Sequence, residues 1–172
     1  MKKINILPFI LLTAILSYGQ KKQDDHKKIR EIIESYSKSV IEKDSTVFYS
    51  LFNEDHVVWC AAYKDRTQAK EIEEKGVKAG SNYFSGSYKG FLRSLFRHKT
   101  TEDKFDNIKI IEDATVASVT MDYSFWADNK MTNWGSKYLN LIKKDGKWQI
   151  TSVIYSLELV KYFKQPDLKN RK

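Results

Sequence analysis

The C-terminal part of the chain predicts a meander of three antiparallel strands. Apolar and polar residues alternate over residues 115–126, over 139–144 and over 147–157. Asp145 and Gly146 separate the last two runs, and an Asp-Gly pair between alternating runs is a strong signal for a tight hairpin turn. The sequence therefore predicts that an antiparallel sheet closes the fold.

The length and composition predict one globular domain in front of a short basic tail. The chain has 172 residues, of which 41% are hydrophobic, so it can bury a sizeable core. Its 7 Gly and 2 Pro leave little room for flexible linkers, and no internal repeat is visible. We place the domain at residues 24–160 and the tail at 161–172.

The N-terminus has the pattern of a signal peptide. Lys2 and Lys3 precede an apolar run over residues 4–16, and Ser17-Tyr18-Gly19 supplies the small residues that favour cleavage. We predict a signal peptide at 1–19 and a periplasmic or secreted protein with no membrane span after cleavage. The run is shorter than the ~20 residues that cross a bilayer. An uncleaved N-terminal anchor is the alternative interpretation.

The single cysteine and the charge exclude several kinds of protein. Cys60 has no partner for an internal disulfide and lies in an apolar run, where cysteine usually acts as a small buried residue. The net charge of +8 falls to +6 without Lys2 and Lys3. Nucleic-acid binding would need a continuous basic face with stacking aromatic residues beside it, and the aromatic residues lie away from the basic clusters. A solvated basic surface is the favoured interpretation of this charge, and attraction to an acidic envelope surface is the alternative.

Helices precede the predicted sheet. An apolar stripe recurs at helical spacing over residues 25–43, formed by Ile29, Ile32, Ile33, Tyr36 and Val40. Asp44 or Ser45 can cap a shorter helix, a strand is predicted over 56–63, and Thr67 can cap a surface helix. Ser87 opens another amphipathic helix, and a strand over 108–111 leads into the meander.

This order of elements resembles the NTF2-like superfamily over residues 25–157. The residues that carry the resemblance are Leu51-Phe52-Asn53-Glu54-Asp55, a strand ending near Trp59, and Gly146-Lys147-Trp148-Gln149-Ile150. Three further segments resemble its SnoaL-like and lumazine-binding branch, namely residues 102–107, Asp122-Tyr123-Ser124-Phe125 and Asn133-Trp134-Gly135. The resemblance implies an α+β cone, in which a curved, mostly antiparallel sheet wraps over N-terminal helices around an internal pocket. It also implies a homodimer that pairs through the outer face of the sheet.

Strand alternation proposes which side chains line that pocket. If both hairpin loops contain an even number of residues, Asp122 and Lys137 share a face and lie near each other across two strands. That face also carries Trp126, Ser152 and Trp148, whereas the opposite face carries an aromatic ladder with Tyr123, Tyr138 and Tyr155. We take the first face as pocket and the ladder as dimer interface. An odd loop would exchange part of the two sets, and the reverse assignment stays open.

Two function classes follow from this assignment. The first is a small-molecule binding protein for a partly aromatic ligand, with candidate contacts Trp59, Asp122, Trp126, Lys137 and Ser152. The second is a cofactor-independent isomerase or lyase with Asp122 as general base, which is chemistry that the resemblance implies. The closing strand reads Ser152 to Ser156 where several enzymatic relatives show histidine, which favours binding over catalysis. A structural module with a filled cone is a third possibility.

No cofactor or metal is expected. His26, His56 and His98 have no spacing that suggests metal ligation, and the sequence has no phosphate-binding glycine loop.

Overall fold

A six-stranded sheet packed on one side by helices forms the body of the protein. The computed structural model describes residues 7–167, with side chains from Asp24 onward. The helices are α1 (Leu7–Glu42), α2 (Ser45–Ser50), α3 (Asp65–Lys75), the short 3₁₀ helix η1 (Gly76–Ala79) and α4 (Tyr88–Leu95). The strands are β1 (Val58–Tyr63), β2 (Tyr83–Ser85), β3 (Thr101–Glu112), β4 (Val116–Ala127), β5 (Lys130–Lys144) and β6 (Lys147–Leu159).

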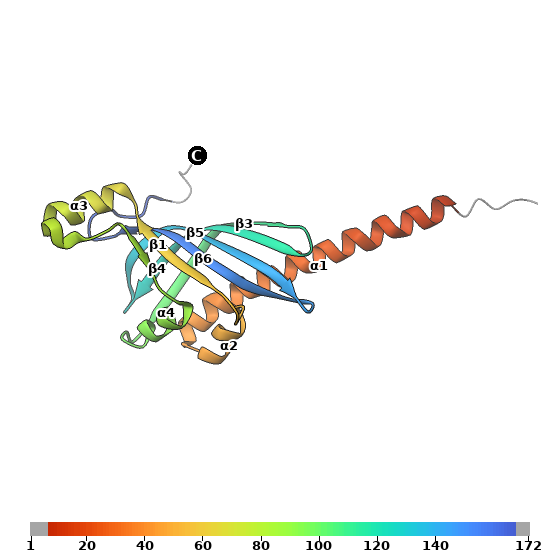
Figure 1. Ribbon diagram of the computed structural model, residues 1–172, viewed down its shortest axis with the longest axis horizontal. Coiled ribbons are helices and arrows are strands. Elements are labelled where there is room, and N and C mark those ends of the chain that lie inside the picture. Colours follow the sequence, from red (N-terminus) through yellow and green to blue (C-terminus); the bar gives the residue numbers. More distant parts are fainter. Residues whose placement is uncertain (1–6, 168–172) are drawn as a thin grey trace, which may run out of the picture.

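The sheet is mixed and open, in the order β2-β1-β6-β5-β4-β3. All neighbouring pairs are antiparallel except β1 and β6, which run parallel. Figure 1 shows the sheet curving over α1, α2 and α4, which lie on its inner side. The predicted α+β architecture and the Asp145-Gly146 hairpin are both confirmed.

Local signals explain where the helices begin. The Asp44 side chain accepts a hydrogen bond from Val47 N at 3.0 Å, and Ser87 accepts one from Gly90 N at 3.0 Å, as N-caps do. The prediction that Thr67 caps α3 is wrong, because the helix begins at Asp65 and Lys64 is its N-cap. The Thr67 hydroxyl instead donates to the buried Glu158 carboxylate on β6.

The core lies between the inner face of the sheet and the stripe of α1. Ile29, Ile33, Tyr36 and Val40 are buried as the helical spacing predicted. Phe48 and Phe52, which lie on and just after α2, pack against Tyr36 with ring centroids 5.2 and 6.4 Å from it. Burying a side chain of this size contributes about 1.5–3 kcal/mol, so this layer supplies much of the drive to fold.

A buried carboxylate fixes α1 to the β5–β6 hairpin. Asp25 accepts hydrogen bonds from Lys143 Nζ at 2.5 Å and from Trp148 Nε1 at 3.0 Å. The N-terminal part of α1 extends beyond the sheet (Figure 1). The predicted signal peptide includes residues 1–6, which lie outside the described residues, and its cleavage stays a prediction. Among the described residues, no helix combines the length and hydropathy needed to cross a membrane.

The start of the predicted basic tail holds α3 in place. Lys161 Nζ lies 2.6 Å from Glu71 Oε1, and the Tyr162 hydroxyl donates to the same oxygen at 2.9 Å. Lys75 also pairs with the Glu71 carboxylate. Together, the hydrogen bonds from Lys161 and Lys75 lower the pKa of Glu71 from 4.5 to about 2. Residues 168–172 of the predicted tail lie outside the described residues.

This lowered pKa predicts a specific loss of stability in acid. A carboxyl whose pKa is depressed by folding stabilises the native state above its unfolded pKa, and that contribution is lost as the pH falls from about 4.5 to about 2. Glu71→Gln should therefore reduce the slope of unfolding free energy against pH in this window. Urea unfolding at a series of pH values measures this slope. Glu73→Gln, which changes an exposed glutamate of the same helix, should keep the wild-type slope. An unchanged slope in Glu71→Gln would contradict the assignment.

Candidate functional site

An ion pair lies buried on the inner face of the sheet. Lys137 on β5 and Asp103 on β3 are only 3% and 1% exposed, and Lys137 Nζ donates to Asp103 Oδ2. The strand β4 runs between them, where Met121 is opposite Lys137 and Phe125 is opposite Asp103. The long lysine side chain therefore reaches past β4 beneath the sheet to meet the carboxylate.

Four aromatic rings surround the lysine ammonium group. The distances from Lys137 Nζ to the ring centroids are 4.6 Å for Tyr123, 5.1 Å for Phe105, 5.2 Å for Tyr36 and 5.6 Å for Tyr155. Tyr36 comes from α1, so the helix and three strands build the cage together. A ring face attracts a cation, by about 2 kcal/mol or more where water is excluded.

Burial decides how these groups titrate. It raises the pKa of Asp103, against the opposing effect of the Lys137 charge, and it lowers the pKa of Lys137, against the opposing effect of Asp103. Burial and then the nearby Asp103 charge raise the pKa of the Tyr36 and Tyr123 hydroxyls well above the ordinary value. Both tyrosines are therefore neutral hydrogen-bond donors at neutral pH.

Two buried polar atoms at this site have no hydrogen-bond partner among the described residues. They are Asp103 Oδ1 and the Tyr36 hydroxyl oxygen. A side-chain hydrogen bond from the Tyr36 hydroxyl is one of the effects that lower the pKa of Asp103, but its geometry falls short of a normal hydrogen bond, so both atoms are incompletely paired. Buried polar groups are paired in the great majority of cases, so the incomplete pairing of these two atoms needs an explanation.

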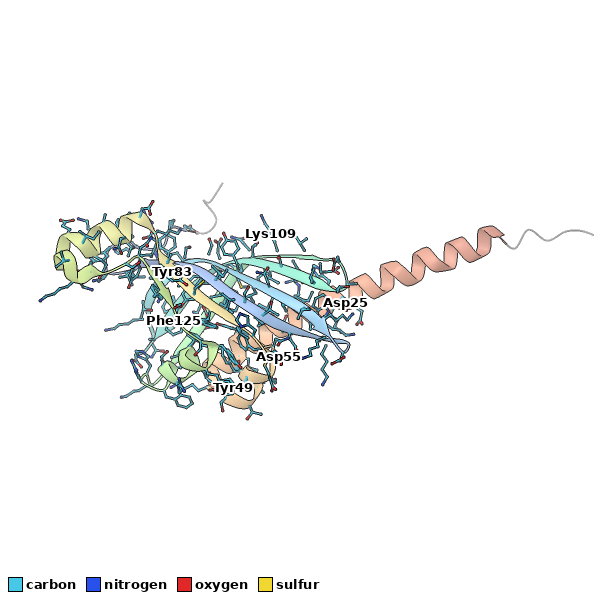
Figure 2. The ribbon with its side chains drawn as sticks, viewed as in Figure 1. Asp25, Tyr49, Asp55, Tyr83, Lys109 and Phe125 are labelled. Carbon is cyan, nitrogen blue, oxygen red and sulfur yellow. The ribbon has the colours of Figure 1, made fainter. Side chains whose placement is uncertain are left out.

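Aromatic rings lead from the ion pair toward α4. Phe91 on α4 stacks on Trp59 with a centroid distance of 4.9 Å and meets Phe125 at 6.1 Å. Phe91 and Phe125 are only partly buried, and Figure 2 shows Phe125 beside α4. The candidate site thus has a polar base at Asp103, Lys137 and Tyr36 and an aromatic rim. No group of three or more possible metal ligands occurs among the described side chains.

Comparison with known proteins identifies the fold. No family model matches the chain, and no curated protein matches it. Among solved structures, it is similar to LinA, with a TM-score of 0.60 and 10% identity over 81% of this chain and 90% of that one. An NTF2-like protein of unknown function from Shewanella baltica gives a TM-score of 0.53 and 18% identity, over 78% and 94% of the two chains.

The fold of this chain is NTF2-like. A third similar structure is a candidate scytalone dehydratase from Novosphingobium aromaticivorans, with a TM-score of 0.59 and 16% identity over 82% of this chain and 89% of that one. These likenesses confirm the predicted NTF2-like cone and support the SnoaL-like resemblance at the level of the fold. Lumazine binding stays a prediction.

The NTF2-like cone brings together only two of the five residues predicted to contact a ligand. Trp59 and Lys137 lie on its inner face. Asp122 lies on the outer face, opposite Ser136, where its carboxylate accepts a hydrogen bond from Asn107 Nδ2 at 2.8 Å. Trp126 and Ser152 are also on the outer face, where their partners are Ser124 and Asn140. The predicted proximity of Asp122 to Lys137 is wrong.

Two β-bulges explain this correction. The β4–β5 turn contains two residues, Asp128 and Asn129, as an even loop requires, but the register then shifts between Phe125 and Trp126. The extra residue, Thr132, moves Asp122 to the face opposite Lys137. A second shift beside Asn140 leaves Thr151 as the extra residue and moves Ser152 outward. The prediction of an inward Trp148 is right, because this residue precedes that shift along β6.

The aromatic ladder is divided for the same reason. Tyr123 and Tyr155 belong to the inner face, so the prediction that they meet a twin subunit is wrong. Tyr138 does lie outside, 47% exposed, near the exposed Ile154 and Val58. Pairing through the outer face stays a prediction that can draw on these three residues, and sedimentation of the full chain measures it.

Proposed function

We propose that this chain binds a small, partly aromatic molecule in its NTF2-like cone, with Asp103, Lys137 and Tyr36 as its polar contacts. The observation that carries the proposal is the buried ion pair with two unpaired polar atoms inside a cage of aromatic rings. The predicted export places this binding in the periplasm or outside the cell.

The energetics of the ion pair support a role beyond packing. Removing two charges from water often costs more free energy than their mutual attraction returns. A protein with apolar residues of similar volume in place of a buried ion pair is therefore commonly as stable as the original. Here the charged pair occupies the centre of an otherwise aromatic interior. A ligand that bonds to Asp103 Oδ1 and to the Tyr36 hydroxyl would satisfy the two atoms that folding leaves unpaired.

The rim residues support the size and character of the ligand. Phe91 and Phe125 are partly exposed and end a continuous set of rings that includes Trp59 and Tyr155. A ligand that enters from the α4 side would reach Lys137 only if these rim side chains rotate aside. A planar ring entering along this path would stack on aromatic faces and bring one polar substituent to the base of the cone.

Matched aspartate substitutions test the site. We expect a thermal-shift screen of lumazine, 4-hydroxybenzoate and related hydroxylated ring compounds to give at least one ligand, with its Kd measured by calorimetry. Asp103→Asn should weaken that ligand about tenfold or more, the loss that ~1.4 kcal/mol produces. Asp122→Asn makes the same change on the outer face of the neighbouring strand and should leave Kd within about twofold.

Tyr36→Phe keeps this test decisive if Asp103→Asn folds poorly, because it removes only the hydroxyl group. It should weaken the same ligand. A ligand whose affinity responds to Asp122→Asn and to neither Asp103→Asn nor Tyr36→Phe would contradict the cone as its site.

A second candidate function is a cofactor-independent isomerase or lyase with Asp103, in place of Asp122, as general base. The observation that favours it is a buried carboxyl whose pKa is raised by desolvation, which is how enzymes tune a carboxylate for proton transfer. The readout is exchange of the α-protons of a bound ketone with deuterated water. If the protein is an enzyme, the wild type should catalyse this exchange and Asp103→Asn should abolish it. If the protein only binds its ligand, the wild type should show no exchange.

A further inference from the structure

Hollows that the cone does not use lie along the sheet. The first, of about 500 Å³, lies over β3, β4 and β5 and is lined by Asn107, Lys109, Thr120, Asp122, Ser136 and Tyr138. The second, of about 380 Å³, lies where Trp126 approaches the C-terminal end of α1, and its lining includes Ile41, Thr101, Glu102 and Lys104. A third, of about 460 Å³, lies toward the β5–β6 hairpin and includes Ser118, Asn140 and Ile142. All three contain residues of β3 and β4, so they follow one another along the same pair of strands.

A β-bulge in β3 concentrates polar groups in the first hollow. The register shifts between Asp106 and Lys109, and Asn107 takes a left-handed conformation with φ of 53°. Asp106 and Asn107 are consequently both exposed, although consecutive residues of a regular strand alternate between faces. Asn107 Nδ2 then donates to Asp122 Oδ2 at 2.8 Å. An amide and a carboxylate are thereby held together above the sheet.

Aromatic rings mark the two ends of this surface. Tyr138 is 47% exposed and lies opposite Thr120. Trp126 is six residues along β4, or about 20 Å at strand spacing. Its Nε1 donates to Ser124 Oγ at 3.1 Å, which fixes the ring, and Lys104 lies over it with Nζ 4.4 Å from the centroid, so a ligand that stacks on this ring must displace the lysine side chain.

We propose that this surface, from Trp126 to Tyr138, binds a neutral oligosaccharide lying along β4. Sugar rings present an apolar face to an aromatic side chain and hydroxyl groups to carboxylate, amide and hydroxyl side chains, which are the groups found here. The charges are of mixed sign: Lys104 pairs with Glu102 at 3.2 Å, and Asp106 lies opposite Asp122. The two carboxylates repel a polyanion, and Lys104 and Lys109 repel a polycation.

This site is independent of the ligand proposed for the cone, because the two lie on opposite faces of the sheet. It overlaps with the predicted subunit pairing only at Tyr138, because Val58 and Ile154 on the β1–β6 part of the outer face stay available to a second subunit. Asp103→Asn should weaken only the ligand in the cone, and Asp122→Asn should weaken only the oligosaccharide. Failure of one proposal is therefore distinguishable from failure of the other.

The experiment is calorimetric titration of the full chain with cellotetraose, chitotetraose and maltotetraose. We expect one of these to bind, with glucose or N-acetylglucosamine at least about tenfold weaker because a single unit reaches one ring only. Trp126→Ala and Asp122→Asn should each weaken the tetrasaccharide about tenfold or more, whereas Asp103→Asn and Ile154→Ala should change its Kd by less than about twofold. Tyr138→Ala, a change at an exposed position, repeats the test without a risk to folding.

Three results would overturn the proposal. The first is an absence of heat with all three tetrasaccharides at millimolar concentration. The second is binding that survives both Trp126→Ala and Tyr138→Ala. The third is stronger binding of a sulfated heparin tetrasaccharide than of any neutral one, which would show an anion-binding surface instead.

Discussion

Gly135→Ala is expected to lower the free energy of unfolding by about 3 kcal/mol, at the upper end of what overpacking costs. A Cβ atom at Gly135 would lie 2.1 Å from the carbonyl oxygen of Ser156 on the neighbouring strand, which is far inside van der Waals contact. That oxygen belongs to backbone, so the strands β5 and β6 must move apart to accept the methyl group. Urea unfolding followed by far-UV circular dichroism measures the loss.

The effect of Gly135→Ala should spread to the candidate site. Tyr123 lies directly opposite Gly135 on β4, and its hydroxyl donates to the Ser156 carbonyl oxygen at 3.0 Å. The same ring lies closest to the Lys137 ammonium group. Displacing Ser156 therefore also displaces one wall of the aromatic cage, and ligand binding in the cone should weaken together with stability.

Gly86→Ala is the matched control for this substitution. A Cβ there would lie 3.7 Å from Trp59 Cδ1, an ordinary contact, so we expect a change in unfolding free energy below about 1 kcal/mol. Equal losses of unfolding free energy in the two alanine variants would show that the close approach of β5 and β6 is not the reason why position 135 needs glycine.

Most of the fold is predictable from local pattern. The helical stripe from Ile29 to Val40 is buried as predicted, and Asp145-Gly146 forms the expected hairpin, because spacing and turn chemistry act over a few residues. The parallel pairing of β1 with β6 follows from neither signal. It joins Val58–Tyr63 to residues nearly a hundred positions later in the chain, and only the resemblance to the NTF2-like superfamily implied a mixed sheet.

The candidate site is harder to predict because side-chain facing depends on every residue between two strands. One extra residue at Thr132 and another at Thr151 reverse the faces of Asp122 and Ser152, and neither threonine interrupts the alternation visibly. Asp103 did leave a signal, since it has the same parity as Thr101 and Phe105 in the first half of β3, where the alternate residues Glu102, Lys104 and Asp106 are charged. A carboxylate on the apolar parity of a strand is the pattern that indicates a buried functional group.

Lys137→Met is expected to cost about 3–5 kcal/mol at neutral pH, because it leaves the Asp103 carboxylate buried without its counter-charge. Met keeps most of the volume of the lysine side chain, so the loss reports charge and not a cavity. Chemical unfolding of Lys137→Met and wild type at a series of pH values measures it. Lys144→Met, which breaks the exposed ion pair with Asp55, is the control and should leave the urea midpoint within error of wild type.

The pH dependence of this loss separates charge burial from a packing defect. Burial already raises the pKa of Asp103 in the folded protein, and without Lys137 the folded pKa rises further. Stability from a raised carboxyl pKa is present below the unfolded pKa, near 3.8, and is lost as the pH rises through the folded pKa. The deficit of Lys137→Met should therefore be smallest near pH 4 and grow toward neutrality, whereas a packing defect would cost the same at every pH.

A variant that replaces both charges tests why the ion pair of Asp103 and Lys137 is present. Asp103→Leu together with Lys137→Met removes the unpaired carboxylate, and apolar replacement of a buried ion pair is often neutral or stabilising. We expect the double variant to recover most of the stability lost in Lys137→Met while losing the ligand that binds in the cone. A double variant that stays as unstable as Lys137→Met would mean that Asp103 and Lys137 serve the fold, and the ligand-binding role assigned to them would then lack its energetic support.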